Sequence, residues 1–169
     1  MKRRLFLQQL AVSAGALPLL TLGVSPTARA AAVNTIDVYK SPLCGCCEGW
    51  VAHLRDNGFT VKVHDVDDTG AHRARLGMPE RFGSCHTGSI GGYAIEGHVP
   101  AADIRRLLAT RPKAVGLAVP GMPVGSPGME QGPRVDPYQV LLVREDGGAS
   151  VFARYPDVRQ RQAKDRPGS

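Results

Sequence analysis

The chain has 169 residues and a formal net charge of +6, but four of its 21 basic residues and none of its 15 acidic residues lie in segment 1–30. Without that segment, 139 residues remain with 17 basic and 15 acidic side chains, a net charge of +2. Recognition of nucleic acid needs a clustered basic patch, and because none remains, we exclude a nucleic-acid partner. This length is sufficient for one domain with its own hydrophobic core.

Segment 1–30 has the pattern of a secretory signal. The basic start KRR precedes a broken apolar run, and the segment ends in ARA, with cleavage expected after Ala30. The run is too short to span a membrane, so we expect no transmembrane anchor after cleavage. Arg3-Arg4 followed by apolar residues favours a twin-arginine signal, with an ordinary secretory signal as the alternative. We therefore expect a signal peptide at 1–30, one domain at 31–157 and a disordered, charged tail at 158–169.

Hydrophobic periodicity predicts alternating strands and helices in the first half of the domain. Strands are expected at 35–39 and 59–64, where apolar residues alternate with polar ones. A helix is expected at 47–58 between them, because apolar residues recur there at helical spacing. A short helix follows, capped within 67–69 and ended by Gly77.

The second half of the domain predicts two hairpins around one helix. The glycine-rich segment 81–100 predicts a hairpin with a glycine pair near its turn, and a helix is expected at 100–111. Segment 119–130, VPGMPVGSPGME, has neither a helical nor a strand period. A second hairpin is expected at 138–156, with an Asp-Gly turn.

This order of elements predicts an α/β, thioredoxin-like fold: β-α-β, then β-β-α, with an extra C-terminal β-hairpin. Proteins of that fold with a redox CxxC usually carry an X-Pro pair just before the third strand. Here the stretch SCHT at 84–87 stands in that place, without a proline. The difference weakens an oxidoreductase interpretation and directs attention to Cys85.

The stretch SPLCGCCEGW at 41–50 holds three of the four cysteines. Cys44 and Cys47 form a CxxC pair, which closes a disulfide readily or acts as a redox pair. At the start of a helix, the helix dipole favours their thiolates. Cys46 is surplus to a redox pair, because a third thiol exchanges with a neighbouring disulfide. Three thiolates in one place are the ligands that soft Cu(I) prefers, so the cluster favours a metal site, while a structural disulfide stays open.

Further candidate ligands lie downstream. Cys85 and His86 are adjacent in a glycine-rich turn, and His98 precedes the predicted helix at 100–111. Imidazole and thioether groups are also copper ligands, and two methionines fall in the unpatterned segment 119–130. Four thiols with these partners allow more than one copper ion, in the Cu(I) or Cu(II) state. The candidate metal ligands are Cys44, Cys46, Cys47, Cys85, His86, His98, Met122 and Met129.

Three other histidines and one other methionine have no such neighbours. His53, His64 and His72 fall on a helix, a strand and a short helix, and we expect them to be solvated or hydrogen-bonded. Met78 is expected to pack at the end of a helix.

The motifs CGCC (44–47), SCHT (84–87), EGHVP (96–100) and PGMPVGSPGME (120–130) together resemble the CopG-type proteins, over roughly 36–155 of this chain. That family consists of small exported proteins, long described as a domain of unknown function and often encoded beside copper-resistance genes. The resemblance implies a thioredoxin-like fold in the periplasm of a Gram-negative bacterium. It also implies that the four cysteines are the core copper ligands.

The expected function is therefore that of a periplasmic copper-binding protein for copper resistance, which holds Cu(I) and oxidises it to Cu(II). Two alternatives stay open: a thiol-disulfide oxidoreductase that uses the Cys44/Cys47 pair, and a chaperone that delivers copper to a periplasmic efflux or copper-handling protein. A domain held together by disulfides alone is the non-catalytic alternative.

Overall fold

The computed structural model describes residues 34–156. The expected signal peptide at 1–30 and the expected tail at 158–169 lie outside the described residues. In the described part, no helix is both long enough and apolar enough to cross a membrane.

The chain begins with a β-α-β unit. Strand β1 (Thr35–Lys40) and strand β2 (Thr60–Asp65) pair in parallel, and helix α2 (Gly45–Asp56) connects them. Parallel neighbours require such a crossover connection. The helix begins two residues earlier than predicted, so Cys46 and Cys47 lie in its first turn and Cys44 is its N-cap residue.

A short helix and a hairpin follow. Helix α3 (Thr69–Arg75) is capped by the Asp68 side chain, which accepts a hydrogen bond from the Ala71 N–H at 3.1 Å. A 3-10 turn, η1 (Glu80–Phe82), leads into the antiparallel strands β3 (His86–Ile90) and β4 (Tyr93–Glu96). The predicted hairpin is therefore confirmed.

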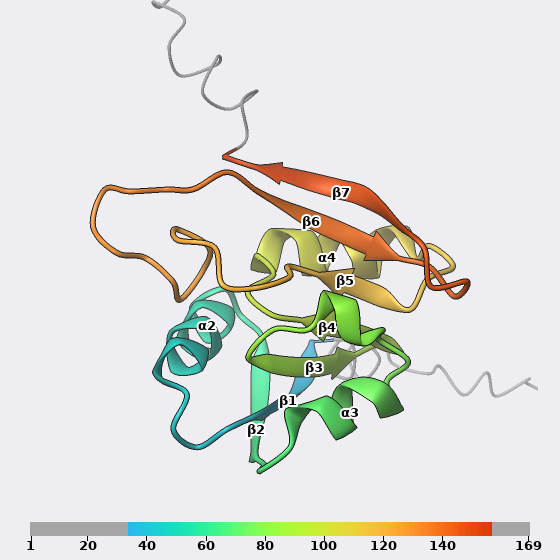
Figure 1. Ribbon diagram of the computed structural model, residues 1–169, viewed down its shortest axis with the longest axis horizontal. Coiled ribbons are helices and arrows are strands. Elements are labelled where there is room, and N and C mark those ends of the chain that lie inside the picture. Colours follow the sequence, from blue (N-terminus) through green and yellow to red (C-terminus); the bar gives the residue numbers. More distant parts are fainter. Residues whose placement is uncertain (1–33, 157–169) are drawn as a thin grey trace, which may run out of the picture.

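The C-terminal elements extend the same sheet. Helix α4 (Ala101–Thr110) leads to a short strand, β5 (Gly116–Ala118), and the hairpin of β6 (Tyr138–Val143) and β7 (Ala149–Tyr155) completes the described chain. Because β5 pairs in parallel with β4 and antiparallel with β6, the described strands form one seven-stranded sheet, β2-β1-β3-β4-β5-β6-β7 (Figure 1). The α/β class is confirmed, but the C-terminal hairpin continues the sheet through β5, a strand that the sequence did not predict.

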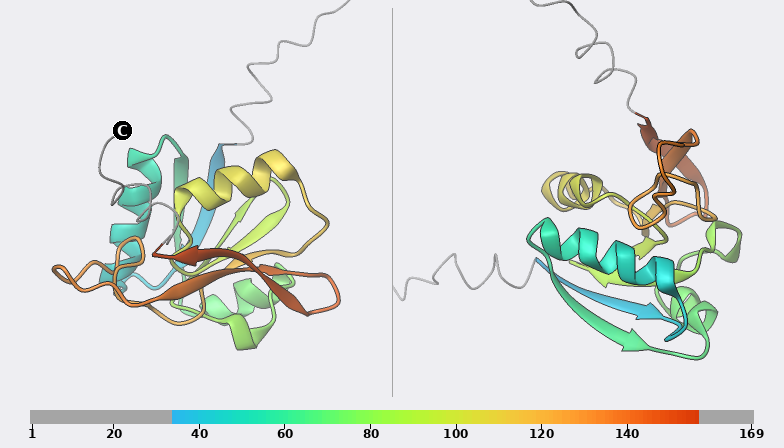
Figure 2. Two further views of the ribbon diagram at one scale, coloured as in Figure 1. Left: turned by 90° about the horizontal axis from the view of Figure 1, so that it is seen from above. Right: turned by 90° about the vertical axis from the view of Figure 1, so that its left-hand side faces the viewer.

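Helices lie on both faces of the sheet (Figure 2). Successive residues of a strand point to opposite faces, so neighbours such as Ile95 and Ala94 enter different cores. The larger core joins Ile95 and the inward residues of β1 to α2 and α4, through side chains such as Trp50 and Leu107. The smaller core lies under α3 and η1 and contains Met78, as predicted for that methionine, and Phe82.

Candidate metal centre

The sheet register brings the two cysteine motifs together. Strand β3 is antiparallel to β1, with Lys40 at the end of β1 paired to His86 at the start of β3. The CGCC motif follows β1, whereas Cys85 immediately precedes β3. Both motifs therefore lie at the same edge of the sheet, although 38 residues separate Cys47 from Cys85.

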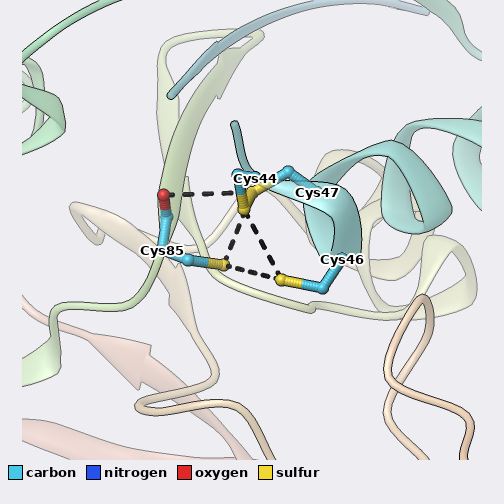
Figure 3. Close-up of side chains that lie close together, drawn as sticks. All are labelled: Cys44, Cys46, Cys47 and Cys85. Carbon is cyan, nitrogen blue, oxygen red and sulfur yellow. Dashed lines mark hydrogen bonds between the residues drawn. A yellow bond between two sulfur atoms is a disulfide. The ribbon is translucent and has the colours of Figure 1, made fainter. Parts of the chain in front are cut away.

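Four sulfur atoms meet at this edge (Figure 3). Cys44 and Cys47 form a disulfide, whereas Cys46 and Cys85 are free thiols. The Cys46 Sγ lies 3.5 Å from the Cys44 Sγ and 3.8 Å from the Cys85 Sγ, and the Cys85 Sγ lies 3.6 Å from the Cys47 Sγ. The four Sγ atoms lie within 4.8 Å of one another. Once the disulfide is reduced, they offer a set of soft ligands suited to Cu(I).

Two imidazoles adjoin the sulfur atoms. The Nδ1 of His86 lies 3.3 Å from the Cys85 Sγ, and the Nε2 of His98 lies 3.2 Å from it. The other nitrogen of each ring faces a backbone carbonyl oxygen: Gly97 O at 3.1 Å for His86, and Pro127 O at 2.8 Å for His98. A carbonyl only accepts, so those nitrogens carry the proton and the nitrogens beside Cys85 present a lone pair. Histidines that ligate metals are oriented in this way.

Burial determines the charge state of the metal-free site. It lowers the pKa of His86 to about 3 and also lowers the pKa of His98, so both rings are neutral at physiological pH. Burial, together with the neighbouring Cys46, raises the pKa of the Cys85 thiol. The thiol therefore stays protonated until a cation displaces the proton, as coordinating thiols require.

Packing holds the imidazoles in place. The ring centroids of Trp50 and His86 lie 4.3 Å apart, and the His86 and His98 rings are in T-shaped contact with their centroids 4.9 Å apart. The indole Nε1 of Trp50 donates to the Val99 carbonyl at 2.8 Å. Both imidazoles are fully buried, and these contacts restrict the rotation of the His86 ring.

The proline- and glycine-rich segment between β5 and β6 lies against the first turn of α2. At Gly128, which has φ +83°, an added Cβ would lie 2.4 Å from the Trp50 nitrogen and 2.8 Å from the Cys46 carbonyl. At Gly49, an added Cβ would lie 2.9 Å from the Gly128 Cα. Two glycines thus allow backbone to meet backbone, and this contact places the Pro127 carbonyl at His98.

The two methionine candidates lie in this segment. Met122 is 52% exposed and lines an open cavity of about 570 Å³ together with Ser84, Cys85 and Gly121. Met129 is half-buried, and its backbone N–H closes a turn onto the Ser126 carbonyl at 2.8 Å. The segment therefore brings Met122 to the Cys85 side of the cluster.

The sequence interpretation missed a buried lysine beside the motif. Lys40 is 2% exposed, and its Nζ lies 2.7 Å from Glu48 and 3.1 Å from Asp65. Hydrogen bonding to Glu48, more than to Asp65, raises its pKa above the ordinary value, although burial opposes this. The ion pair ties the end of β1 to the first turn of α2. The signal was present in the sequence, since Lys40 continues the inward alternation of Ile36 and Val38.

The remaining histidines make the ordinary contacts predicted for them. His53 Nε2 accepts the Ala101 N–H at 3.1 Å, and His64 Nε2 lies 2.8 Å from Asp37. His72 Nε2 lies 2.8 Å from the Arg75 guanidinium.

The chain is similar to one protein family and to two solved structures. A family described as "Protein of unknown function, DUF411" matches residues 82–129. Two solved structures described as copper resistance protein copG, forms 2 and 1, are each 56% identical to this chain with a TM-score of 0.69. Each alignment covers 72% of this chain, and 98% or 97% of the solved one. No curated protein matches. At this identity and coverage, the chain belongs to the CopG-type family of copper-resistance proteins.

Proposed function

We propose that this protein binds copper as part of copper resistance and holds Cu(I) in its cysteine cluster. The observation that carries the proposal is the convergence of four sulfur atoms with two neutral imidazoles whose outer nitrogens are already hydrogen-bonded. Soft sulfur ligands select Cu(I), and the solved structures of the family are described as copper resistance proteins.

The ligand set supports more than one copper ion. A single Zn²⁺ would use four ligands, whereas the candidates here number six close donors, and Met122 lies beside Cys85. Thiolates bridge Cu(I) ions, so four of them can hold several ions in one cluster. Met122 would add a thioether ligand at the rim of that cluster, and Met129 of the same segment would be a second one.

The mixed donor set also supports redox cycling. Thiolates favour Cu(I), whereas imidazole accepts both Cu(I) and Cu(II). In the proposed oxidation, each Cu(I) loses one electron to an external acceptor such as dioxygen and becomes Cu(II), the less membrane-permeant form. His86 and His98 would retain the oxidised ion, because both present a lone pair toward Cys85.

We place this function in the periplasm, after export through the signal expected at 1–30. We also infer a thioredoxin-like core. The strand order β2-β1-β3-β4 supports that fold, as does the position of α2 and α4 on one face with α3 on the other. The motif at the start of α2 would then occupy the site of a redox CxxC.

An anaerobic titration of the reduced mature protein with Cu(I), against a competing chelator, tests the proposal. One or more Cu(I) should be retained per chain, and Cys46→Ser or Cys85→Ser should abolish tight binding. His53→Gln is the matched control, because His53 is a histidine of α2 outside the cluster. Unchanged stoichiometry and affinity in Cys46→Ser would refute the cluster. Readmission of air should then produce a Cu(II) EPR signal if the protein oxidises its copper.

A second candidate function is thiol-disulfide exchange, which the Cys44–Cys47 disulfide favours. In this function the reduced Cys44 thiolate would attack a substrate disulfide, form a mixed disulfide and release one substrate thiolate. Cys47 would then attack the Cys44 sulfur, release the second substrate thiolate and close the Cys44–Cys47 disulfide. Insulin reduction that needs Cys44 and Cys47 but neither Cys46 nor Cys85 would favour this function over copper binding.

Delivery of copper to a periplasmic efflux or copper-handling protein is compatible with the same site. Transfer of Cu(I) to such a partner without a change of oxidation state would identify a chaperone, whereas appearance of Cu(II) would identify an oxidase.

A further inference from the structure

A buried ion pair lies beside the turn that carries Cys85. Glu96, the last residue of β4, is fully buried, and Arg73 of α3 is 4% exposed. The Arg73 Nε lies 3.0 Å from the Glu96 Oε1. Neither residue has a side-chain hydrogen bond to a candidate ligand in the described part of the chain, so they are not themselves part of the ligand set.

Both members of the pair bind the backbone of one residue, Ser84. The Ser84 N–H donates to the Glu96 Oε1 at 2.6 Å, and the Arg73 guanidinium donates to the Ser84 carbonyl at 2.8 Å. Ser84 immediately precedes Cys85. One ion pair thus holds the peptide groups on both sides of Ser84, including the one that it shares with Cys85.

Close packing leaves this segment little freedom. An added Cβ at Gly97 would lie 2.8 Å from the Ser84 Cβ, and one at Gly83 would lie 3.0 Å from the Arg73 Cζ. The Gly97 N–H also donates to the His86 carbonyl at 3.0 Å. The turn that carries Cys85 is therefore bound on both sides, by the ion pair and by the backbone after β4.

General stability is a poor explanation for a charge pair at this position. Removal of two charges from water is costly, and buried ion pairs often stabilise a fold no more than apolar side chains of similar size. In the described part of the chain, Arg73 Nε and Glu96 Oε2 make no hydrogen bond, so the bonds to the Ser84 backbone are what this pair adds to local geometry. The geometry fixed here is that of Cys85, whose Sγ lies within 4 Å of Cys46, Cys47 and both imidazoles.

We propose that Arg73 and Glu96 are positioning residues that hold Cys85 in the orientation needed to ligate copper. The proposal rests on the proposed copper-binding function. Outer residues that orient metal ligands typically contribute 10–100-fold to affinity. Loss of the pair should therefore weaken copper binding by about that factor without removal of a ligand.

The chain offers a matched control in Glu80. This glutamate also pairs with Arg73, through two contacts of 3.0 and 2.9 Å to one guanidinium nitrogen, but it is 83% exposed. It has no hydrogen bond to Ser84 among the described contacts. Glu80→Gln therefore removes a charge from the same arginine without release of the Cys85 turn, whereas Glu96→Gln removes the acceptor charge at Ser84.

The experiment compares the full-length mature protein with Glu96→Gln, Arg73→Lys and Glu80→Gln. Anaerobic Cu(I) competition should give dissociation constants about 10–100-fold weaker for Glu96→Gln and Arg73→Lys, and within about twofold of wild type for Glu80→Gln. Arg73→Lys retains the charge but lacks the fork that reaches Ser84 and Glu96 together. If Glu96→Gln fails to fold, Arg73→Lys alone still tests the proposal.

A second readout uses no metal. In the disulfide form only Cys46 and Cys85 are free, so alkylation by iodoacetamide, followed by peptide mass spectrometry, reports each thiol separately. We expect several-fold faster modification of Cys85 in Glu96→Gln and Arg73→Lys, with the rate at Cys46 unchanged. Equal acceleration at both thiols would mean general loosening and would overturn the proposal, as would wild-type rates and affinity in both variants. Failure of the wild-type protein to bind copper would refute the proposed function alone, because the alkylation rates would still test the positioning of Cys85.

Discussion

The Nε2 of His98 lies 3.2 Å from the Sγ of Cys85, because Cys85 precedes β3 and His98 follows β4 at the open end of the β3–β4 hairpin. The carbonyl of Pro127 fixes the proton of His98 on the far nitrogen, at 2.8 Å. The near nitrogen therefore presents its lone pair to the Cys85 thiol before any metal is bound. The site is therefore preorganised for a cation. Its metal-ligating atoms point inward, and its protons either point outward or can be displaced.

Copper binding should strengthen as pH rises. Burial raises the pKa of the Cys85 thiol, so a metal ion must displace a proton from it at neutral pH. Because each proton released changes the affinity about tenfold per pH unit, Cu(I) dissociation constants measured at pH 6, 7 and 8 should fall steadily. The Cys85 thiol should contribute about one proton to this slope. Affinity that does not change with pH would contradict protonated thiols in the metal-free site.

The close contact between Gly128 and helix α2 should be needed for copper binding. Gly128→Ala places a methyl group 2.4 Å from the Trp50 nitrogen, in a segment that binds His98 through Pro127. We expect a loss of about 1–3 kcal/mol of unfolding free energy from this overpacking, together with weaker copper binding. Urea denaturation and Cu(I) competition measure the two effects.

Gly132→Ala is the control for this change. Gly132 has a similar positive φ, +66°, but no atom within 4 Å of an added Cβ. It should lose only the roughly 1 kcal/mol that a left-handed conformation costs a residue with a side chain. Equal effects of the two substitutions on copper affinity would mean that the contact between Gly128 and α2 has no role in the site.

Local patterns predicted most of the described elements. Alternation gave β1 and β2, the cap at Asp68 gave the start of α3, and paired glycines gave the β3–β4 turn. Strand β5 has only three residues, GLA, which is too short for an alternating pattern. Its strand conformation comes from pairing with β4 and β6, and a non-local cause of that kind leaves no signal in the segment itself.

The candidate ligands could be predicted from residue type, but the residues that hold them in position could not. Cysteines and histidines are rare enough that their clustering indicates chemistry. Lys40, Arg73 and Glu96 are common charged residues, and their burial depends on elements far apart in the sequence. The Gly49–Gly128 contact likewise joins segments 79 residues apart, so neither glycine could be distinguished from a turn glycine in advance.

The metal-free protein should lose stability as the solution becomes acidic, in part because of His86. Its pKa is about 3 in the folded state, well below the ordinary 6.5, because burial disfavours the imidazolium. The unfolded chain therefore binds a proton below pH 6.5 that the folded chain does not. This contribution to stability is complete above 6.5 and is lost progressively down to about 3, by at most about 1.4 kcal/mol per pH unit.

The difference between wild type and His86→Gln isolates this contribution. Glu96 acts in the opposite direction, because burial raises its pKa and the folded state takes up its proton first. Urea denaturation at pH 4.5, 5.5, 6.5 and 7.5 should therefore give a steeper decline for wild type than for His86→Gln. Parallel curves would show that His86 binds its proton equally well in both states.

Reduction of the Cys44–Cys47 disulfide should increase copper capacity. In the disulfide form, two of the four sulfur atoms are bonded to each other and only Cys46 and Cys85 offer thiolates. Cu(I) needs thiolate rather than disulfide sulfur for tight binding. The reduced protein should therefore retain more Cu(I) per chain than the oxidised protein, when both are titrated without air and their free thiols are counted.

A double variant tests whether the copper gained on reduction binds to Cys44 and Cys47 or whether reduction only makes the site more accessible. Cys44→Ser with Cys47→Ser cannot form this disulfide, so its copper content should be the same with or without prior reduction and close to that of oxidised wild type. Equal copper retention by oxidised and reduced wild-type protein would mean that Cys44 and Cys47 are not ligands. The metal site would then consist of Cys46, Cys85 and the two imidazoles, and the CxxC pair would be left for thiol-disulfide chemistry.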